Sequence, residues 1–120
     1  MPDPTSPPAR AGVLELLRLF RDDAAVADRY GATCLDKARA IEPTLRAFEY
    51  LPTDVARKPG LLSGIPVAIK DIIATADMPT TNGSAVYKDH IPAADAWVVE
   101  CLRNLGATIF GKTPARKRDG

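Results

Sequence analysis

The spacing of apolar residues predicts two helices in the first third of the chain. Between residues 12 and 21, apolar side chains recur at i, i+3, i+4 and i+7, the period of one helix face. A second helix begins at Asp22-Asp23, since carboxylates favour a helix N-terminus. It ends before Pro43, since the residue preceding a proline avoids the helical region. We expect the two helices to form an antiparallel pair. Their apolar positions are Val13, Leu16, Leu17 and Phe20, then Val26, Tyr30, Cys34, Ala38 and Ile41.

Shorter apolar runs in the rest of the chain predict strands. Residues 45–51 are partly aromatic and fit a strand, and the almost wholly apolar residues 65–69 fit a buried strand that runs on to Ile73. Small and polar residues predict a loop over 77–92. A strand over 107–110 closes the pattern.

One more helix is predicted between that loop and the last strand. Asp95 can cap its N-terminus, and Gly106 stands where a left-handed helix stop is wanted. Its apolar stripe consists of Val98, Cys101, Leu102 and Leu105.

The order strand, long loop, helix, strand is that of a crossover unit, which makes the two strands parallel. A parallel pair needs helices on both of its faces. The predicted fold class is therefore α/β, with an N-terminal helix pair followed by part of a mixed or parallel sheet flanked by helices. Because so few strands make only a small sheet, we expect them to be one part of a larger sheet.

Composition narrows the class of protein. The 120 residues fit one domain, and 46% hydrophobic with 26% charged residues is typical of a soluble globular chain. A net charge of +1 gives no general attraction to nucleic acid or to an anionic membrane. Residues 2–8 lack a signal-peptide core, and the apolar run 13–20 is too short to span a bilayer. We expect a cytoplasmic protein that binds neither nucleic acid nor a membrane.

Metal and cofactor chemistry finds no support in the residue types. His90 is the only histidine, and Cys34 and Cys101 are far apart in the sequence. This set does not make a metal site, and no cofactor is expected. The two cysteines are interpreted as small buried thiols, with a disulfide left as an alternative.

Residues 106–113 match the phosphate-loop pattern GxxxxGK[ST], which makes a nucleotide-binding module one alternative. That mechanism needs a strand before the first glycine and a helix after the lysine. Here a helix precedes Gly106, the residues between the glycines are strand formers, and Pro114 follows Thr113. We therefore disfavour nucleotide binding. The basic residues 112–120 are interpreted as a solvated, frayed terminus.

Lys70 is the candidate for chemistry. It ends the strand 65–69, and both faces of that strand are apolar, so we expect its amine inside the sheet or at its rim, in dry surroundings. A lysine acts as a base near neutral pH when its pKa falls by about 3 units from about 10.4, and burial lowers it. The alternative is a lysine that reaches from a strand end into water. Asp71 is expected to bond backbone amides of the following loop.

At this point several segments resemble one family, the amidase signature family. The lysine segment is Leu61-Leu62-Ser63-Gly64-Ile65-Pro66-Val67-Ala68-Ile69-Lys70-Asp71. The loop Met78-Pro79-Thr80-Thr81 with Gly83-Ser84, the helix to Leu105 and the segment 106–113 follow in the family's order. The two opening helices and residues 41–48 also fit. The resemblance covers about residues 11–113.

This resemblance implies hydrolysis of an amide bond by a Ser–cis-Ser–Lys triad in which Lys70 is the lysine. The two serines come from a Gly/Ser-rich segment well downstream in the family, and Ser63 and Ser84 do not match it. After Thr113 the sequence departs from the family pattern. We therefore expect a truncated chain that is inactive alone and marginally stable, because a bare sheet edge lacks its neighbours.

The expected organisation has three parts: a disordered arm over 1–10, the N-terminal portion of an amidase domain over 11–113, and a divergent basic tail over 114–120. The partner implied by the family is a small-molecule amide substrate, bound once the remaining part of the fold is supplied. Self-association through the exposed sheet edge is a further expectation. A non-catalytic interaction fragment remains the main alternative function.

Overall fold

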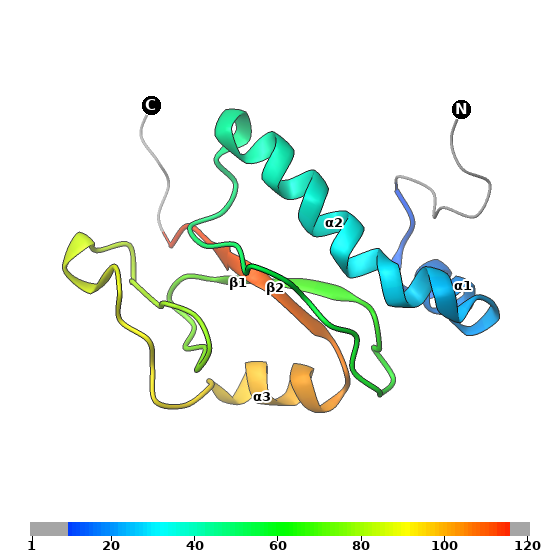
Figure 1. The fold of residues 1–120 in the computed structure, drawn as a ribbon. Coiled ribbons are helices and arrows are strands. Elements are labelled where there is room, and N and C mark those ends of the chain that lie inside the picture. Colours follow the sequence, from blue (N-terminus) through cyan, green and yellow to red (C-terminus); the bar gives the residue numbers. More distant parts are fainter. Residues whose placement is uncertain (1–9, 116–120) are drawn as a thin grey trace.

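The computed structural model describes residues 10–115, so the predicted arm 1–10 and basic tail 114–120 lie almost wholly outside the described residues. Figure 1 shows the order of elements along the chain. They are the helices α1 (Val13–Asp22) and α2 (Ala24–Leu45), the strand β1 (Pro66–Lys70), the short 3₁₀ helix η1 (Ala85–Tyr87), the helix α3 (Trp97–Asn104) and the strand β2 (Thr108–Thr113).

The first two helices form where the apolar spacing predicts them. The Asp23 carboxylate accepts hydrogen bonds from the backbone N–H groups of Ala25 (3.1 Å) and Val26 (3.3 Å), which caps α2. Leu16 and Phe20 of α1 pack against α2 and against the residue that precedes β1. The buried members of this cluster are Leu16, Phe20, Val26, Ala27 and Ile65.

The predicted end of α2 is wrong, because the helix continues through Pro43 to Leu45. A proline this close to the C-terminus removes one N–H donor without interrupting a long run of helical hydrogen bonds. Arg46 then takes a left-handed conformation, with φ 51°, and its N–H donates to the Glu42 carbonyl at 2.8 Å. The Glu42 carboxylate also accepts from the Phe48 N–H at 3.0 Å, which fixes the exit from the helix.

The strand predicted for residues 45–51 is not formed. Only an isolated antiparallel bridge joins Tyr50 to Lys112. The following segment lies against α2, because the Arg39 guanidinium donates to the Pro52 carbonyl (2.7 Å) and to that of Thr53. Bonding to a helix side chain thus replaces the sheet pairing that the aromatic residues suggested.

The predicted parallel pair is confirmed, and the fold is α/β. β1 and β2 are parallel and make the two-stranded sheet found among the described residues. Figure 1 shows α2 on one side of this sheet and α3 on the other. On the α3 side, Val99 packs against Ile69 and Ile109. On the α2 side, Leu35 and Ala38 pack against Phe110. Burial of these apolar groups holds the three layers together.

The strand β1 ends at Lys70 and does not run on to Ile73. The Asp71 N–H still bonds to the Thr113 carbonyl (2.8 Å), but the Ile73 N–H turns back to the Lys70 carbonyl (2.9 Å). A turn therefore begins directly after the lysine, and the loop that follows folds back over the end of the sheet.

The helix α3 differs in two details from its prediction. Its N-cap is Ala96, because the Asp95 carboxylate instead accepts from the Ala76 N–H (2.7 Å) and the Arg103 Nε (2.9 Å). Its most buried side chain is Val99, while Val98 and Leu105 are exposed. The predicted stop is confirmed, since Gly106 has φ 86°.

Candidate functional site

Lys70 is the last residue of β1, opposite Thr113 of β2. Strand alternation places its side chain on the face of Ala68, away from the buried Ile69. That placement agrees with the sequence pattern, but the expected dry surroundings are absent: the Lys70 side chain is exposed. Within residues 10–115 its ammonium group has no hydrogen-bond or ion-pair partner.

The reason lies in what covers the sheet. Among the described residues, β1 pairs only with β2, so the outer edge of β1 is unpaired and the strand is not central here. The helix α2 packs on Phe110 of β2 and leaves Ala68 and Lys70 exposed on the same side. The apolar sequence of β1 is that of a strand with both faces covered, but the described residues leave the face with Ala68 and Lys70 uncovered.

Asp71 behaves as predicted. Its side chain is 0% exposed, and its carboxylate accepts hydrogen bonds from the Thr81 N–H at 2.9 Å and from the Thr81 hydroxyl. Its carbonyl accepts from the Asn82 N–H at 2.9 Å. Asp71, the residue after Lys70, is therefore bound through its side chain and its carbonyl to the far end of the loop.

Lys112 is the residue that sequence reasoning missed. The sequence pattern predicts a solvated basic terminus that begins at Lys112, but its side chain is 0% exposed. Its ammonium group donates to the Thr80 hydroxyl (2.6 Å), the Ile73 carbonyl (2.9 Å), the Thr75 hydroxyl (3.0 Å) and the Pro79 carbonyl (3.3 Å). The Asp71 carboxylate lies 3.8 Å away. The lysine with enclosed, hydroxyl-lined surroundings is thus Lys112 rather than Lys70.

Burial lowers the pKa of Lys112, since desolvation disfavours the charged amine, and the negative charges of Asp71 and Asp77 oppose that shift. A lowered pKa alone does not make a base. All four oxygens around the amine belong to the protein itself, and the side chain has no exposed surface at which a substrate could reach it.

A bulge at Gly111 brings Lys112 to this position. Val67 pairs with Ile109 and Ala68 pairs with Gly111, so Phe110 is an extra residue in β2. Regular alternation would place Lys112 beside Phe110 on the α2 side, whereas the bulge pairs it with Ile69 on the α3 side. Gly111 has φ 148°, and a Cβ there would lie 2.6 Å from the Tyr50 carbonyl oxygen. Glycine is required at this point.

The two serines near the lysine segment have local roles. The Ser63 hydroxyl donates to the Lys58 carbonyl and accepts from the Arg57 Nε at 2.8 Å. The Ser84 hydroxyl accepts from the Val86 N–H at 3.3 Å and caps η1. Both arrangements are those of turn-stabilising hydroxyls.

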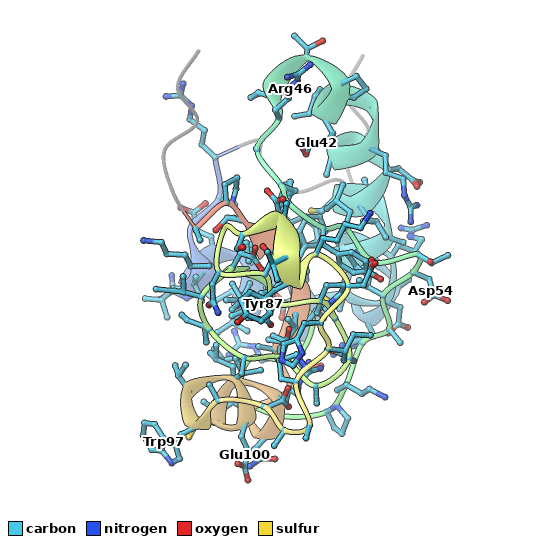
Figure 2. All side chains as sticks on the ribbon, turned by 90° about the vertical axis from the view of Figure 1, so that its left-hand side faces the viewer. Glu42, Arg46, Asp54, Tyr87, Trp97 and Glu100 are labelled. Atoms are coloured by element: carbon cyan, nitrogen blue, oxygen red, sulfur yellow. The ribbon has the colours of Figure 1, made fainter. Side chains whose placement is uncertain are left out.

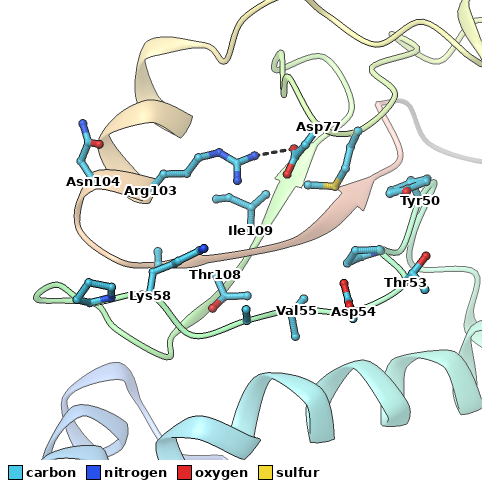
Figure 3. Close-up of a pocket in the computed structure, with 15 residues that line it drawn as sticks. Tyr50, Thr53, Asp54, Val55, Lys58, Asp77, Arg103, Asn104, Thr108 and Ile109 are labelled. Carbon is cyan, nitrogen blue, oxygen red and sulfur yellow. Dashed lines mark hydrogen bonds and ion pairs between the residues drawn. The ribbon is translucent and has the colours of Figure 1, made fainter.

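A groove of about 680 Å³ lies between the segment 50–59 and the α3–β2 unit. Figure 3 shows Arg103 extending over it toward Asp77, with which it forms an ion pair of 2.6 Å. Asp54 and Lys58 lie on the opposite wall. Since the charged groups of one wall already neutralise each other, the groove shows no unpaired buried charge to attract a ligand.

The phosphate-loop alternative does not fit the structure. The residues between its two glycines include Thr108, Ile109 and Phe110 of strand β2, which pairs with β1. Lys112 is enclosed by protein oxygens. Backbone amides committed to a sheet cannot cradle a phosphate.

Other candidate chemistry is equally unsupported. Within residues 10–115, no group of three His, Cys, Asp or Glu side chains is placed to hold a metal ion. Cys34 and Cys101 are free and half-buried, which rules out a disulfide between them here. Over the same described range, no helix has both the length and the apolar character that a membrane span requires.

Comparison with known proteins decides the family. Residues 15–117 match the sequence model of the family named Amidase. The chain belongs to the amidase family. It is 33% identical to a glutamyl-tRNA(Gln) amidotransferase subunit from Acidothermus cellulolyticus over 118 residues, covering 87% of this chain. It is 42% identical to a putative amidase, AmiD, of Mycobacterium bovis over 73 residues, covering 59% of this chain and 15% of that protein.

Solved structures confirm the amidase fold. The corresponding glutamyl-tRNA(Gln) amidotransferase subunit from Thermotoga maritima superposes with a TM-score of 0.79 at 28% identity over 87% of this chain. The peptide amidase of Stenotrophomonas maltophilia superposes with a TM-score of 0.71 at 28% identity over 88% of it. The chain nevertheless spans only 23% of the Acidothermus and Thermotoga proteins and 25% of the peptide amidase. It corresponds to about a quarter of an amidase fold.

Proposed function

We propose that this chain supplies the lysine-bearing quarter of an enzyme that hydrolyses carbon–nitrogen bonds of small-molecule amides. The observation that carries the proposal is the family match over residues 15–117, which includes the whole segment from Leu61 to Asp71. Within that segment Lys70 ends a strand at the edge of the sheet, on the uncovered face.

In this proposal Lys70 is the base of a Ser–cis-Ser–Lys triad, and the two serines belong to the part of the fold that this chain does not span. The neutral amine of Lys70 takes the proton of the cis-serine hydroxyl, which in turn takes the proton of the nucleophilic serine. The serine oxygen then bonds to the amide carbon, the carbon–nitrogen bond breaks, and the proton passes to the leaving amine. Water afterwards releases the acyl group from the serine.

Exposure of Lys70 in the described residues supports this division of labour. In the proposal, the remaining three quarters of the fold pair with the outer edge of β1 and cover the face with Ala68 and Lys70. That cover desolvates the amine and brings the hydroxyls to it. The 120-residue chain alone is then inactive, since the members of a triad act as a unit.

The test is a chimaera in which residues 10–115 replace the corresponding segment of the Stenotrophomonas maltophilia peptide amidase. We expect the folded chimaera to hydrolyse the amide substrate of the peptide amidase, and the 120-residue chain to show no turnover in the same assay. Turnover by the chain alone, or a chimaera with native circular dichroism and no turnover, would contradict the proposal.

A second candidate function is a non-catalytic interaction fragment, and the unpaired outer edge of β1 is the observation that favours it. An uncovered strand edge pairs readily with another strand, including that of a second copy. Sedimentation of the chain over a hundredfold concentration range tests this: a defined dimer supports edge pairing, and a monomer throughout rejects self-association. The cytoplasmic location predicted from the sequence also stays a proposal, to be tested by cell fractionation.

A further inference from the structure

We propose that Lys112 is a positioning residue for Lys70: its ammonium group fixes the loop 71–81, and that loop fixes the end of β1 at which Lys70 lies. The importance of Lys70 rests on the proposed function, but the mechanical link between the two lysines does not. This role differs from the one that the phosphate-loop pattern over residues 106–113 would give Lys112, which is to bind a phosphate.

The first step is the arrangement of oxygens around the amine. Lys112 reaches from β2 to four oxygens that lie 32 to 39 residues earlier in the chain. Two are main-chain carbonyls, of Ile73 and Pro79, and two are the hydroxyls of Thr75 and Thr80. An ammonium group has three N–H donors, so the four contacts use its whole capacity. The Lys112 side chain thus bonds to both halves of the loop, at residues 73 and 75 and at residues 79 and 80.

The second step links the loop to Lys70. The Asp71 carboxylate is 3.8 Å from the Lys112 amine and holds the Thr81 N–H. The Asp71 N–H bonds to Thr113, the residue after Lys112, and the Lys70 carbonyl accepts from the Ile73 N–H. Both of these groups belong to the peptide bond between Lys70 and Asp71. One is bonded to the residue that follows Lys112, and the other to Ile73, whose own carbonyl accepts from the Lys112 amine.

The third step excludes a reacting role for Lys112. It is 0% exposed, and it lines neither the groove beside residues 50–59 nor the groove between α1 and residues 57–63. A group that forms bonds with a substrate must touch it, so Lys112 acts through the loop. The bulge at Gly111 supports this role, because it places the amine under the loop while Lys70 projects from the opposite face.

The experiment measures hydrogen exchange of backbone amides by NMR in the 120-residue chain. The test variant is Thr80→Val, which removes one oxygen from the Lys112 amine with little change of shape. The rescue variant is Thr80→Ser, which restores the hydroxyl. The matched control is Thr108→Val, at a buried threonine of the same strand as Lys112 whose hydroxyl is not among the four oxygens that accept from the amine.

We expect Thr80→Val to raise the exchange rates of the Asp71, Thr81 and Asn82 amides about tenfold, because it removes the shortest contact of the Lys112 amine and leaves the buried Thr75 N–H without its hydroxyl acceptor. Amides of α2 should keep their rates, Thr80→Ser should restore the loop, and Thr108→Val should leave it unchanged. The backbone amide signal of Lys70 should shift in Thr80→Val and return in Thr80→Ser. Equal acceleration throughout the chain, or no rescue by serine, would overturn the inference.

Lys112→Met removes all four bonds at once, and its readout is the chimaera defined above. We expect kcat to fall at least tenfold with KM nearly unchanged, since Lys70 is misplaced while substrate binding is retained. If Lys112→Met does not fold, we expect Thr80→Val in the same chimaera to lower kcat by a smaller factor, again with KM nearly unchanged. An unchanged kcat in a folded variant would overturn the positioning role. An inactive parent chimaera together with the expected exchange pattern would reject the proposed function alone.

Discussion

The Lys112 ammonium group and the Asp71 carboxylate lie 3.8 Å apart, and both side chains are 0% exposed. Each charge is satisfied by further bonds, Lys112 by four oxygens and Asp71 by the Thr81 N–H and hydroxyl. Removal of one partner from such a pair leaves an uncompensated buried charge, which costs about 3–5 kcal/mol. The pair therefore makes the end of the sheet sensitive to substitution.

This pair predicts a specific dependence of stability on pH. Burial lowers the pKa of Lys112 in the folded chain, with Asp71 and Asp77 acting against the shift. Between that lowered value and the unfolded value of about 10.4, the unfolded state binds more protons, so stability rises with pH. The measurement is urea unfolding from about pH 7 to about pH 11 for the wild type and for Lys112→Met.

The difference in the free energy of unfolding between these two chains should grow with pH and become constant above about 10.4. Taking the difference removes contributions that both chains share. Among these are Tyr30, whose pKa burial raises to about 12, and Cys34, whose thiol pKa burial also raises. A difference that falls as pH rises would contradict the lowered pKa of Lys112.

Gly111→Ala should destabilise the chain by about 3 kcal/mol or more. A non-glycine residue at φ 148° carries backbone strain of about 1–3 kcal/mol, and the added Cβ would lie 2.6 Å from a backbone oxygen of Tyr50. Thermal unfolding followed by circular dichroism measures the loss. Gly31→Ala in α2 is the control, where improved helix propensity offsets a 3.1 Å contact with Val55 and the net change stays within about 1 kcal/mol.

Particular residues show how far the fold could be predicted from the sequence. The period of apolar positions is enough for α1, α2 and the parallel strands, because each of them buries one continuous face. Pro43 misleads, since helix ends depend on local hydrogen bonds such as that from Arg46 to Glu42. Lys112 is hidden from a pattern that assumes regular alternation, because a bulge reverses the face it occupies. The glycine that precedes it is the one signal that could have indicated the bulge.

The expected burial of Lys70 fails for a different reason. An apolar strand indicates a surface that some segment covers, and the chain spans about a quarter of its relatives' length. Sequence identifies the need for a cover and not whether the cover belongs to the same 120 residues. The role of Lys70 therefore stays a prediction that rests on the family.

Arg103 should hold α3 to the loop that precedes it. Its guanidinium donates to Asp95 at 2.9 Å and to Asp77 at 2.6 Å. A lysine ammonium group cannot donate to both carboxylates in the fixed geometry of a guanidinium group. We therefore expect Arg103→Lys to lower the free energy of unfolding by about 1 kcal/mol, with a smaller loss at high salt. Urea unfolding at about 0.05 M and about 1 M salt measures it. Arg29→Lys, on the exposed side of α2, is the matched control and should show no change.

Leu35→Ala should cost about 2–5 kcal/mol, because the leucine is 2% exposed and joins α2 to the sheet through Phe110. Leu14→Ala, at a side chain that is 69% exposed, should change the free energy of unfolding by less than about 0.5 kcal/mol. Urea midpoints of the two variants give the comparison. Similar losses for both would show that α2 does not pack on β2 as described.

The exposed side chain of Trp97 lies at one end of the molecule and can report on what covers that end. Figure 2 places Trp97 and Glu100 of α3 at one end of the molecule and Glu42 of α2 with the following Arg46 at the other, with Tyr87 of η1 between them. Trp97 is 79% exposed, so its fluorescence reports on whatever covers α3. We expect a blue shift of its emission in the chimaera relative to the chain alone if the remaining fold packs there. Unchanged emission would indicate that this end stays in water.

The most direct test of the central claim compares three lysines in the peptide amidase chimaera by their kcat. Lys70→Ala should reduce kcat to background with native circular dichroism retained, since the triad then lacks its base. Lys112→Met should reduce it partially, and Lys88→Ala, at an exposed lysine of the loop after η1, should leave it unchanged. Turnover that survives Lys70→Ala at the level of Lys88→Ala would contradict the account.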